Sequence, residues 1–586
     1  MRQSNYDKAP FVAVPGGFEV LKGWPAICHG LKERLRGRAP GVLVVDTYPG
    51  VNDAELLVQL ESQLRPALTV RTLDLKKPEP ELLNLIGRNL TDDRIFGVLS
   101  CHTLEEFFDS ARLREARRTV ELQRDGLVLV YGVGAVLVAR GDVLVHADLA
   151  RWEIQLRYRR GLDNWGANNG GEDFFRKYKR GFFVEWRVAD RHKFSLFDRV
   201  DFFLDTHTPG QPKCVEGRAV REGLHHAATR PFRVVPFFDP APWGGQWMKE
   251  VCNLDRSVHN YGWCFDCVPE ENSLLLGFGS ERIELPSLDV VGREPVALLG
   301  DEVHARFGRE FPIRFDFLDT MGGGNLSLQV HPLTEYIQQH FGMHYTQDES
   351  YYILDAGPGA SVYLGLREGI DPKAMIGDLE GAQAGGGAFA TENYINQWPA
   401  KKHDHFLIPA GTVHCSGSGS MVLEISATPY IFTFKMWDWG RVGLDGKPRP
   451  IHLNHGVANI QWDRTTRWVK DNLLNRVEPV ASGDGWREER TGLHEREFIE
   501  TRRHWFTKAV PHDTCGGVQV LNLVEGEEAL VESPDGKFKP FVVHYAETFI
   551  VPAAVGRYTM RPQGLGSNQR CATMKAFVRS GIQQCA

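Results

Sequence analysis

The N-terminal part of the chain, up to residue 228, alternates short β-branched runs with stretches of helical periodicity. Apolar runs at Val42–Val45, Leu127–Tyr131 and Ala135–Val138 predict short buried strands. Residues 148–158 repeat apolar side chains at helical spacing and predict a helix. Alternating strands and helices are typical of α/β layers with some parallel sheet. We therefore predict an N-terminal α/β domain.

Local motifs in this part of the chain indicate structure rather than ligand binding. Thr103 and Glu106 form a capping box ahead of a helical pattern. The Gly-Val-Gly sequence at 132–134 follows a predicted strand but lacks the Gly-Lys-Ser/Thr ending of a phosphate-binding loop, so we predict a tight turn between strands. Basic clusters at 157–160 and 176–180 are, in an acidic protein, typical of solvated helix faces.

The pattern changes at about residue 232, where short apolar runs punctuated by Gly and Pro begin and continue to the C-terminus. Many evenly spaced short strands are typical of β-sandwiches and jelly-roll barrels. Two similar strand–Pro–Ala segments, Phe406–Ala410 and Phe549–Ala553, suggest a duplicated barrel. The Trp-rich, charged residues 462–505 are predicted to link the two barrels. The predicted domains span residues 1–228, 229–470 and 471–586.

Composition narrows the class of protein. The 586 residues carry a formal net charge of −7, which argues against a dedicated nucleic-acid binder. No window approaches the roughly 18 uninterrupted apolar residues that a membrane span needs. The first residues lead into no apolar signal core, so a cytoplasmic protein is expected. Among the 10 Cys, Cys264 and Cys267 form a lone CxxC pair, which favours ordinary packing over a zinc ribbon.

Four residues form a candidate metal site. On a strand, the side chains of Gln329 and His331 leave the same face because they are two positions apart. Glu349 precedes a predicted strand, and His414 follows another. This mixed nitrogen and oxygen set suits zinc or another divalent first-row ion, with a position left open for substrate. The alternative is that the two histidines are hydrogen-bonded core residues.

The segments around these residues resemble the type I mannose-6-phosphate isomerases of the cupin superfamily. The resemblance rests on Leu326–Pro332, Glu349–Tyr352, Pro409–His414 and Leu423–Ile425, with Trp243-Gly244-Gly245 and Phe311–Asp319 upstream. It covers roughly residues 230–580 and implies an all-β double cupin with some helical insertions after the α/β domain. Arg557 stands where the second barrel would match His414, which implies that this barrel holds no metal.

The resemblance also implies roles for individual residues. The metal ligands of the family fall on Gln329, His331, Glu349 and His414. Ser327 matches a serine that contacts the substrate phosphate, and Arg441 lies where a cation meets it. Glu424 matches an acid in the pocket and is the candidate for proton transfer. Lys435 stands at the position of the family's catalytic arginine.

The chain also departs from the family pattern. Gln347 replaces a lysine two residues before the ligand glutamate, Lys435 replaces the arginine, and Leu333 replaces an acid. Another cation, such as Lys401 or Lys402, would have to enter the pocket to replace the lysine. Metal binding is thus the safest inference.

The predicted function is that of a zinc-dependent or other metal-dependent isomerase that interconverts mannose 6-phosphate and fructose 6-phosphate through an enediolate. The predicted partner is a sugar phosphate, with no nucleic acid and no membrane, and the sequence carries no signal of an oligomeric state. The alternative is a non-catalytic or regulatory cupin that binds a sugar or sugar phosphate. A weaker third option is an iron-dependent cupin oxidoreductase, which the ligand spacing fits less well.

Overall fold

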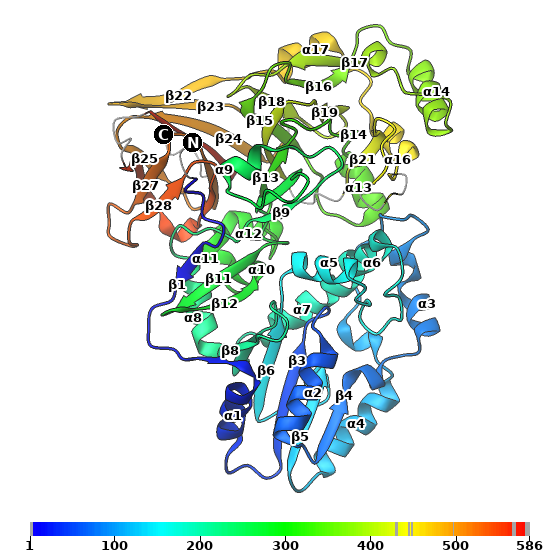
Figure 1. Cartoon of the computed structure of the whole chain (residues 1–586), viewed down its shortest axis with the longest axis vertical. Helices are drawn as coiled ribbons and strands as arrows, with labels where there is room; N and C mark the ends of the chain where they lie inside the picture. The colour runs from blue at the N-terminus through cyan, green and yellow to red at the C-terminus, as the bar shows by residue number, and fades with distance from the viewer. Residues whose placement is uncertain are drawn as a thin grey trace. The chain divides into compact units, whose positions relative to one another are not determined.

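The computed structural model describes residues 4–427, 432–443, 446, 449–495, 497–564 and 570–579. The chain forms two compact units (Figure 1). The N-terminal unit contains Phe11–Ala227 and Glu270–Glu294, and the C-terminal unit contains Met1–Pro10, Ala228–Pro269 and Pro295–Ala586. Residues 270–294 thus return to the N-terminal unit, beyond the boundary predicted at residue 228. The two predicted barrel domains lie within one unit.

A seven-stranded sheet forms the centre of the N-terminal unit, in the order β2-β8-β7-β6-β3-β5-β4 (Figure 1). The central pairs β3–β5, β3–β6, β4–β5 and β6–β7 are parallel, whereas β8 runs antiparallel to β7 and β2. The strands are β2 (Val20–Lys22), β3 (Gly41–Thr47), β4 (Leu68–Arg71), β5 (Leu127–Gly132), β6 (Val143–Asp148), β7 (Phe202–Asp205) and β8 (Lys213–Glu216). The run at Val42–Val45 lies inside β3, and its continuous apolar character is typical of parallel strands buried on both faces.

Helices and a small sheet complete this unit. The helices are α1 (Gly23–Leu35), α2 (Asp53–Leu64), α3 (Glu79–Leu90), α4 (Ser110–Leu122), α5 (Arg151–Arg159), α6 (Phe174–Arg180), α7 (Trp186–Leu196), α8 (Gly217–Ala227) and α10 (Leu288–Arg293). Shorter turns are η1 (Thr72–Leu75), η2 (Leu104–Phe107), η3 (Ala135–Leu137) and the π-helix η4 (Gly181–Glu185). The three-stranded sheet contains β1 (Phe11–Ala13), β11 (Ser273–Phe278) and β12 (Glu281–Pro286).

Two sequence-based predictions for this unit are wrong. The run at Ala135–Val138 is not a strand but contains the 3₁₀ turn η3. Gly132 and Gly134 have φ angles of 118° and 76°, so the chain turns out of the sheet directly after β5.

The basic cluster at 176–180 does not form the solvated helix face that the sequence predicts. Lys177, Lys179 and Arg180 are buried rather than solvated. The Lys177 ammonium donates to the main-chain oxygens of Tyr158 and Gly170 at 2.6 and 2.9 Å, which ties the α5–α6 loop to α6. Buried loop carbonyls need donors, and these cations supply them.

The C-terminal unit contains four antiparallel sheets. A six-stranded sheet, β18-β15-β20-β13-β10-β9, and a five-stranded sheet, β17-β16-β19-β14-β21, carry the residues predicted to bind metal. Their strands are β9 (Phe237–Asp239), β10 (Trp263–Cys267), β13 (Ile313–Asp319), β14 (Leu328–Val330), β15 (Glu349–Ala356), β16 (Ser361–Leu366), β17 (Ile395–Pro399), β18 (His405–Ile408), β19 (His414–Ser416), β20 (Ser420–Ala427) and β21 (Phe434–Trp437).

The other two sheets have six strands, β22-β23-β24-β31-β26-β29, and four strands, β25-β30-β27-β28. Their strands are β22 (Glu478–Gly483), β23 (Trp486–Arg490), β24 (Ile499–Phe506), β25 (Val510–Asp513), β26 (Gln519–Glu525), β27 (Glu528–Glu532), β28 (Phe541–His544), β29 (Thr548–Val551), β30 (Arg557–Pro562) and β31 (Cys571–Val578). Buried side chains of these two sheets, among them Phe506, Leu521, Phe549 and Met560, pack into one core.

The helices of this unit are short: α9 (Trp247–Val251), α11 (Pro295–Leu299), α12 (Asp301–Phe307), α13 (Thr334–Phe341), α14 (Pro372–Gln383), α15 (Thr391–Tyr394), α16 (Leu453–Asn459) and α17 (Thr466–Asn472), with the 3₁₀ turn η5 (Ala553–Val555). Across the described parts of both units, no helix has the length and apolar character needed to cross a bilayer.

Residues 462–505, which were predicted to link the two barrels, form a helix and strands of their own. This segment contains α17, β22 and β23 and enters β24. Its charges do not prevent strand pairing because opposite charges face each other across the strands. Glu489 lies opposite Arg503, and its Oε2 accepts a hydrogen bond from Arg503 Nε at 2.8 Å.

Candidate metal centre

Strand pairing brings the predicted ligands together from three segments of the chain. Gln329 on β14 lies opposite His414 on β19 and, on its other side, opposite Lys435 on β21. His331 follows the end of β14, and Glu349 is the first residue of β15 in the other sheet. Residues that are far apart in sequence therefore meet where the two sheets face each other.

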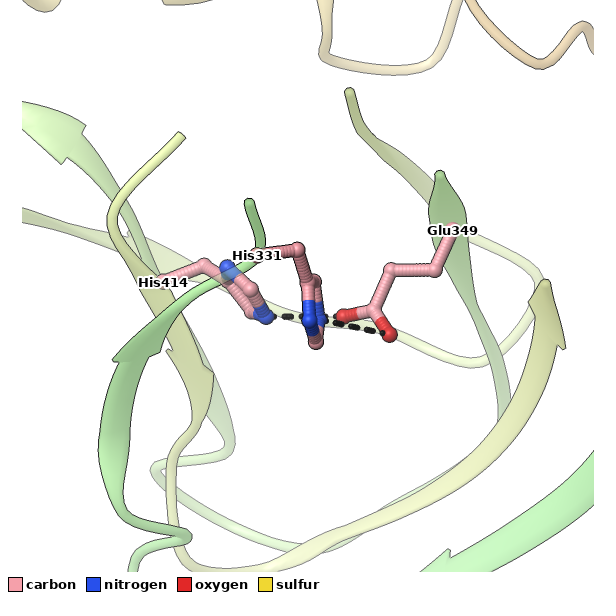
Figure 2. Close-up of side chains that lie close together, drawn as sticks. All are labelled: His331, Glu349 and His414. Carbon is pink, nitrogen blue, oxygen red and sulfur yellow. Dashed lines mark ion pairs between the residues drawn. The ribbon is translucent and has the colours of Figure 1, made fainter. Parts of the chain in front are cut away.

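His331, Glu349 and His414 form a compact triad (Figure 2). Within the described residues they are the only group of three His, Cys, Asp or Glu side chains whose ligand atoms all lie within 4.8 Å of one another. The Nε2 atom of His331 is 3.1 Å from Glu349 Oε2, and the Nε2 atom of His414 is 2.7 Å from Glu349 Oε1. All three side chains are fully buried.

Main-chain acceptors orient the two imidazoles. The Nδ1 atom of His331 is 3.2 Å from the carbonyl oxygen of Phe432, and that of His414 is 2.8 Å from the carbonyl oxygen of Thr412. When each Nδ1 carries the proton and donates it, each Nε2 keeps its lone pair for a metal. Metal-binding histidines are usually held in this way.

Gln329 completes the group as the predicted fourth ligand. Its side-chain amide lies 3.2 Å from His414 Nε2, and its Oε1 accepts a hydrogen bond from the Ser327 hydroxyl at 3.3 Å. A half-turn of the amide exchanges its oxygen and nitrogen, so the amide oxygen can face the triad without movement of the chain.

The electrostatics of the triad suit a cation. Burial raises the pKa of Glu349, but the adjacent His331 and His414 outweigh this effect and hold the pKa well below its usual value. The ligand carboxylate is therefore ionised. His331 Nε2 and Glu349 Oε1 are buried, and neither has a hydrogen-bond partner among the described residues, although both lie at ion-pair distance within the triad. Two imidazoles, a carboxylate and an amide oxygen fit zinc or a similar divalent ion.

The predicted acid Glu424 lies beside the triad, but it is not alone. The side-chain amide of Gln347 donates to Glu349 Oε2 at 3.0 Å and to Glu424 Oε1 at 3.3 Å. Arg314 on β13 forms an ion pair with the same Glu424 oxygen. Burial is the main reason that the pKa of Glu424 is well above its usual value, although Arg314 opposes this rise.

Sequence reasoning missed Arg314. Its guanidinium contacts Glu424 and, through Nε, lies 3.1 Å from Asp316 Oδ1. Burial raises the pKa of Asp316 to about 7 despite that arginine. The available signal was an arginine and an aspartate two positions apart in an otherwise apolar strand. The two proposed substitute cations lie elsewhere: Lys402 pairs with Glu525 at 2.6 Å, and Lys401 is exposed.

The predicted phosphate-binding residues Ser327 and Arg441 and the predicted catalytic residue Lys435 lie on or next to β14 and β21. Ser327 is buried and bound to Gln329, and Lys435 is partly buried opposite that same residue. Arg441 follows β21 and forms an ion pair with Asp438 at 2.5 Å. Asp438 also pairs with Arg449, so two guanidinium groups share one carboxylate there.

A segment after α16 holds the loops that carry the ligands. Arg464 donates to the main-chain oxygens of Pro409 and Ala410 at 2.8 and 2.7 Å and also bonds the Thr412 hydroxyl. Asn459 Oδ1 accepts from the main-chain nitrogen of Leu333, two residues after His331, at 2.8 Å. These contacts fix the turn that supplies the acceptor of His414 and the segment that follows His331.

Curated proteins with similar sequences are known. The chain is 24% identical over 241 residues to the probable mannose-6-phosphate isomerase GmuF of Bacillus subtilis (strain 168), a match that spans 40% of this chain and 69% of that protein. It is 25% identical over 221 residues to the mannose-6-phosphate isomerase of Streptococcus mutans serotype c, which spans 37% of this chain and 63% of the relative. The chain is similar to mannose-6-phosphate isomerases. The resemblance seen in its motifs is confirmed.

Further comparisons concern the fold and the N-terminal part. The crystal structure of mannose 6-phosphate isomerase from Bacillus subtilis aligns with 59% of this chain and 99% of its own, at 18% identity and a TM-score of 0.48. A mutant phosphomannose isomerase from Salmonella typhimurium aligns with 60% of this chain at 14% identity and a TM-score of 0.45. Residues 23–229 match a family described as a domain of unknown function (DUF8485).

Proposed function

We propose that the protein is a metal-dependent isomerase that interconverts mannose 6-phosphate and fructose 6-phosphate through an enediolate. The buried His331–Glu349–His414 triad, in a chain similar to mannose-6-phosphate isomerases, is the observation that supports this function most strongly. In this proposal the first pair of sheets is the metal-binding cupin and the second pair a metal-free cupin. The proposal includes a cytoplasmic location, as expected from the sequence.

The ligands in this proposal are His331, Glu349, His414 and Gln329. A zinc or other divalent first-row ion bound there would stabilise negative charge that develops on the sugar oxygens, a contribution of several kcal/mol. The described triad fits this role because one ligand atom of each residue lies within 4.8 Å of those of the other two.

Glu424 is the residue that we assign to proton transfer. In the aldose-to-ketose direction, its carboxylate takes the proton from C2 and returns it to C1 of the enediolate, while the hydroxyl proton of O2 moves to O1. Its raised pKa makes the carboxylate a stronger base than an exposed glutamate. Gln347 and Arg314 both contact its Oε1, so they orient the group. Such proton transfer contributes about 10²–10⁴-fold to the rate.

The remaining roles concern the phosphate and the charge of the transition state. Ser327 and Arg441 are proposed to bind the phosphate. Lys435, which lies opposite Gln329, supplies a positive charge close to the ligand set. An ammonium group keeps the charge of the arginine it replaces but lacks the planar donor pair.

A second function is supported by a specific contact. Arg314 already neutralises Glu424, and the uncharged Gln347 occupies the position of the family's lysine. A non-catalytic cupin that binds sugar phosphate through the same metal is therefore the alternative.

Turnover of fructose 6-phosphate by purified protein, with added zinc and after chelation, tests the proposal. We expect mannose 6-phosphate to form and the rate to fall to background when the metal is removed. One bound metal per chain without turnover would reject the isomerase and leave the binding alternative.

A further inference from the structure

A polar surface extends from the metal centre across three neighbouring strands of the six-stranded sheet. β15, β20 and β13 lie side by side, and opposite residues on antiparallel strands point to the same face. Glu349 lies opposite Ser426, and Tyr351 lies opposite Glu424. The next strand places Arg314 opposite Ser426 and Asp316 opposite Glu424. The face of the ligand Glu349 thus also carries Arg314, Asp316, Tyr351, Glu424 and Ser426, and we call these five residues with Gln347 the polar wall.

Three uncharged groups on the polar wall are buried without a hydrogen-bond partner in the part of the chain that the structure describes. They are the hydroxyl of Tyr351, the hydroxyl of Ser426 and the side-chain oxygen of Gln347. All three residues are at most 2% exposed. Buried polar atoms are nearly always hydrogen-bonded, because leaving one unpaired is costly. Three such atoms on one face, next to a metal triad, indicate a site for a ligand with several hydroxyl groups.

The charges of the polar wall decide which end of a sugar phosphate it suits. It contains two carboxyl groups, Asp316 and Glu424, against the single guanidinium of Arg314. Such a surface does not favour a phosphate dianion. Neutral hydroxyl groups, which both donate and accept, match the unpaired hydroxyls and the amide oxygen.

The two sides of the metal centre are also chemically different. Ser327 bonds to Gln329 on β14, and Gln329 contacts His414 of the triad. On the other side, Gln347 of the polar wall bonds to Glu349 on β15. A bound sugar phosphate can therefore span the metal with its two unlike ends on opposite sides.

We propose that Tyr351, Ser426 and Gln347 bind the hydroxyl groups of an open-chain sugar phosphate whose phosphate lies toward Ser327 and Arg441. This inference rests on the proposed sugar-phosphate substrate and adds the residues that recognise its carbon chain.

Calorimetric titration of the metal-loaded protein with fructose 6-phosphate and with inorganic phosphate tests this orientation. Tyr351→Phe and Ser426→Ala each remove one hydroxyl and little else. We expect each variant to bind fructose 6-phosphate about three- to tenfold more weakly, the factor for one neutral hydrogen bond. Their affinity for inorganic phosphate should stay at the wild-type value.

The neighbouring Tyr352→Phe variant is the matched control. Tyr352 points to the opposite face of β15, and its hydroxyl is 2.8 Å from His403 Nδ1. This variant should melt at a lower temperature and bind fructose 6-phosphate normally. Tyr351→Phe should not lower the melting temperature of the ligand-free protein, because its hydroxyl has no hydrogen-bond partner to lose among the described residues.

Two results would overturn the inference in different ways. Wild-type affinity for fructose 6-phosphate in both Tyr351→Phe and Ser426→Ala would reject the polar wall while leaving the proposed function intact. Absence of fructose 6-phosphate binding by the metal-loaded wild type would reject the proposed function itself and the polar wall with it.

Discussion

Each histidine of the metal triad is held by a main-chain carbonyl, so the position of a few backbone atoms determines where two lone pairs point. His414 depends on the carbonyl of Thr412 and His331 on that of Phe432. Glu349 faces both Nε2 atoms and is ionised because of them. Loss of Glu349 would leave both Nε2 atoms without their carboxylate partner, and loss of either histidine would remove one of the two ion pairs of Glu349.

Removing one ligand should therefore remove the metal. Glu349→Ala and His414→Ala are each expected to lower the bound metal, measured by elemental analysis after gel filtration, from about one per chain to near zero. His340→Ala changes an exposed histidine on α13 and should retain the wild-type metal content. Full occupancy in both ligand variants would show that the site is elsewhere.

Arg464 is expected to act on the metal through His414. Arg464→Met removes the donors that hold the carbonyls of Pro409 and Ala410, which releases the turn that carries Thr412. We expect about 10–100-fold weaker metal binding, the usual effect of losing an outer-shell partner, in a chelator competition assay. Arg467→Met, at a 90% exposed side chain, serves as the control. Equal affinities in the two variants would contradict this positioning role.

At the scale of elements, a local sequence motif can form as predicted and yet belong to a different helix or turn from the one expected. The capping box of Thr103 and Glu106 forms, yet it caps the 3₁₀ turn η2, whereas Asp109 caps the following helix α4. The strands β18, β24 and β25 place histidines inside the sheets without charge. Burial is the main cause that lowers the pKa of His405 to about 3 and that of His504 to about 4.

These neutral histidines predict a loss of stability in acid. The unfolded chain binds a proton to histidine below about pH 6.5, but folded His405 does not until about pH 3. The stability contributed by His405 is thus fully present above pH 6.5 and falls by about 1.4 kcal/mol per pH unit below it. His405→Phe should make the decline of unfolding free energy between pH 6.5 and 4, followed in urea, measurably shallower. The exposed-site variant His340→Gln should keep the wild-type slope, and an identical slope in both variants would refute this explanation.

At the scale of the whole molecule, an ion-pair network joins residues 270–294 to the rest of the N-terminal unit. Lys193 on α7 lies 2.9 Å from Asp148 Oδ2 at the end of β6 and 2.8 Å from Asp289 Oδ1 on α10. The three side chains are buried. Burial raises the pKa of Asp289 to about 7, although the ammonium of Lys193 opposes this change. The segment therefore depends on contacts with residues about a hundred positions earlier in the chain.

Breaking this network should destabilise one unit selectively. Lys193→Met leaves two carboxyl groups buried without their cation, which typically costs about 3–5 kcal/mol. We expect calorimetry to show a lower melting temperature for the N-terminal unit, while metal content stays at the wild-type level. Arg218→Met, at an exposed pair with Glu222, should have little effect. A loss of metal in Lys193→Met would show instead that the two units fold as one.

Local patterns along the chain were sufficient to predict those strands and those candidate ligands that depend on the spacing of residues. Alternating side chains put Gln329 and His331 on one face, and apolar runs marked β3 and β15. Contacts between distant strands decided the rest. Arg314 meets Glu424 only because β13 and β20 pair in one register, and Lys177 is buried only because the α5–α6 loop folds over it. Periodicity reports which way a side chain points, whereas its partner and its burial depend on which other segments of the chain fold against it.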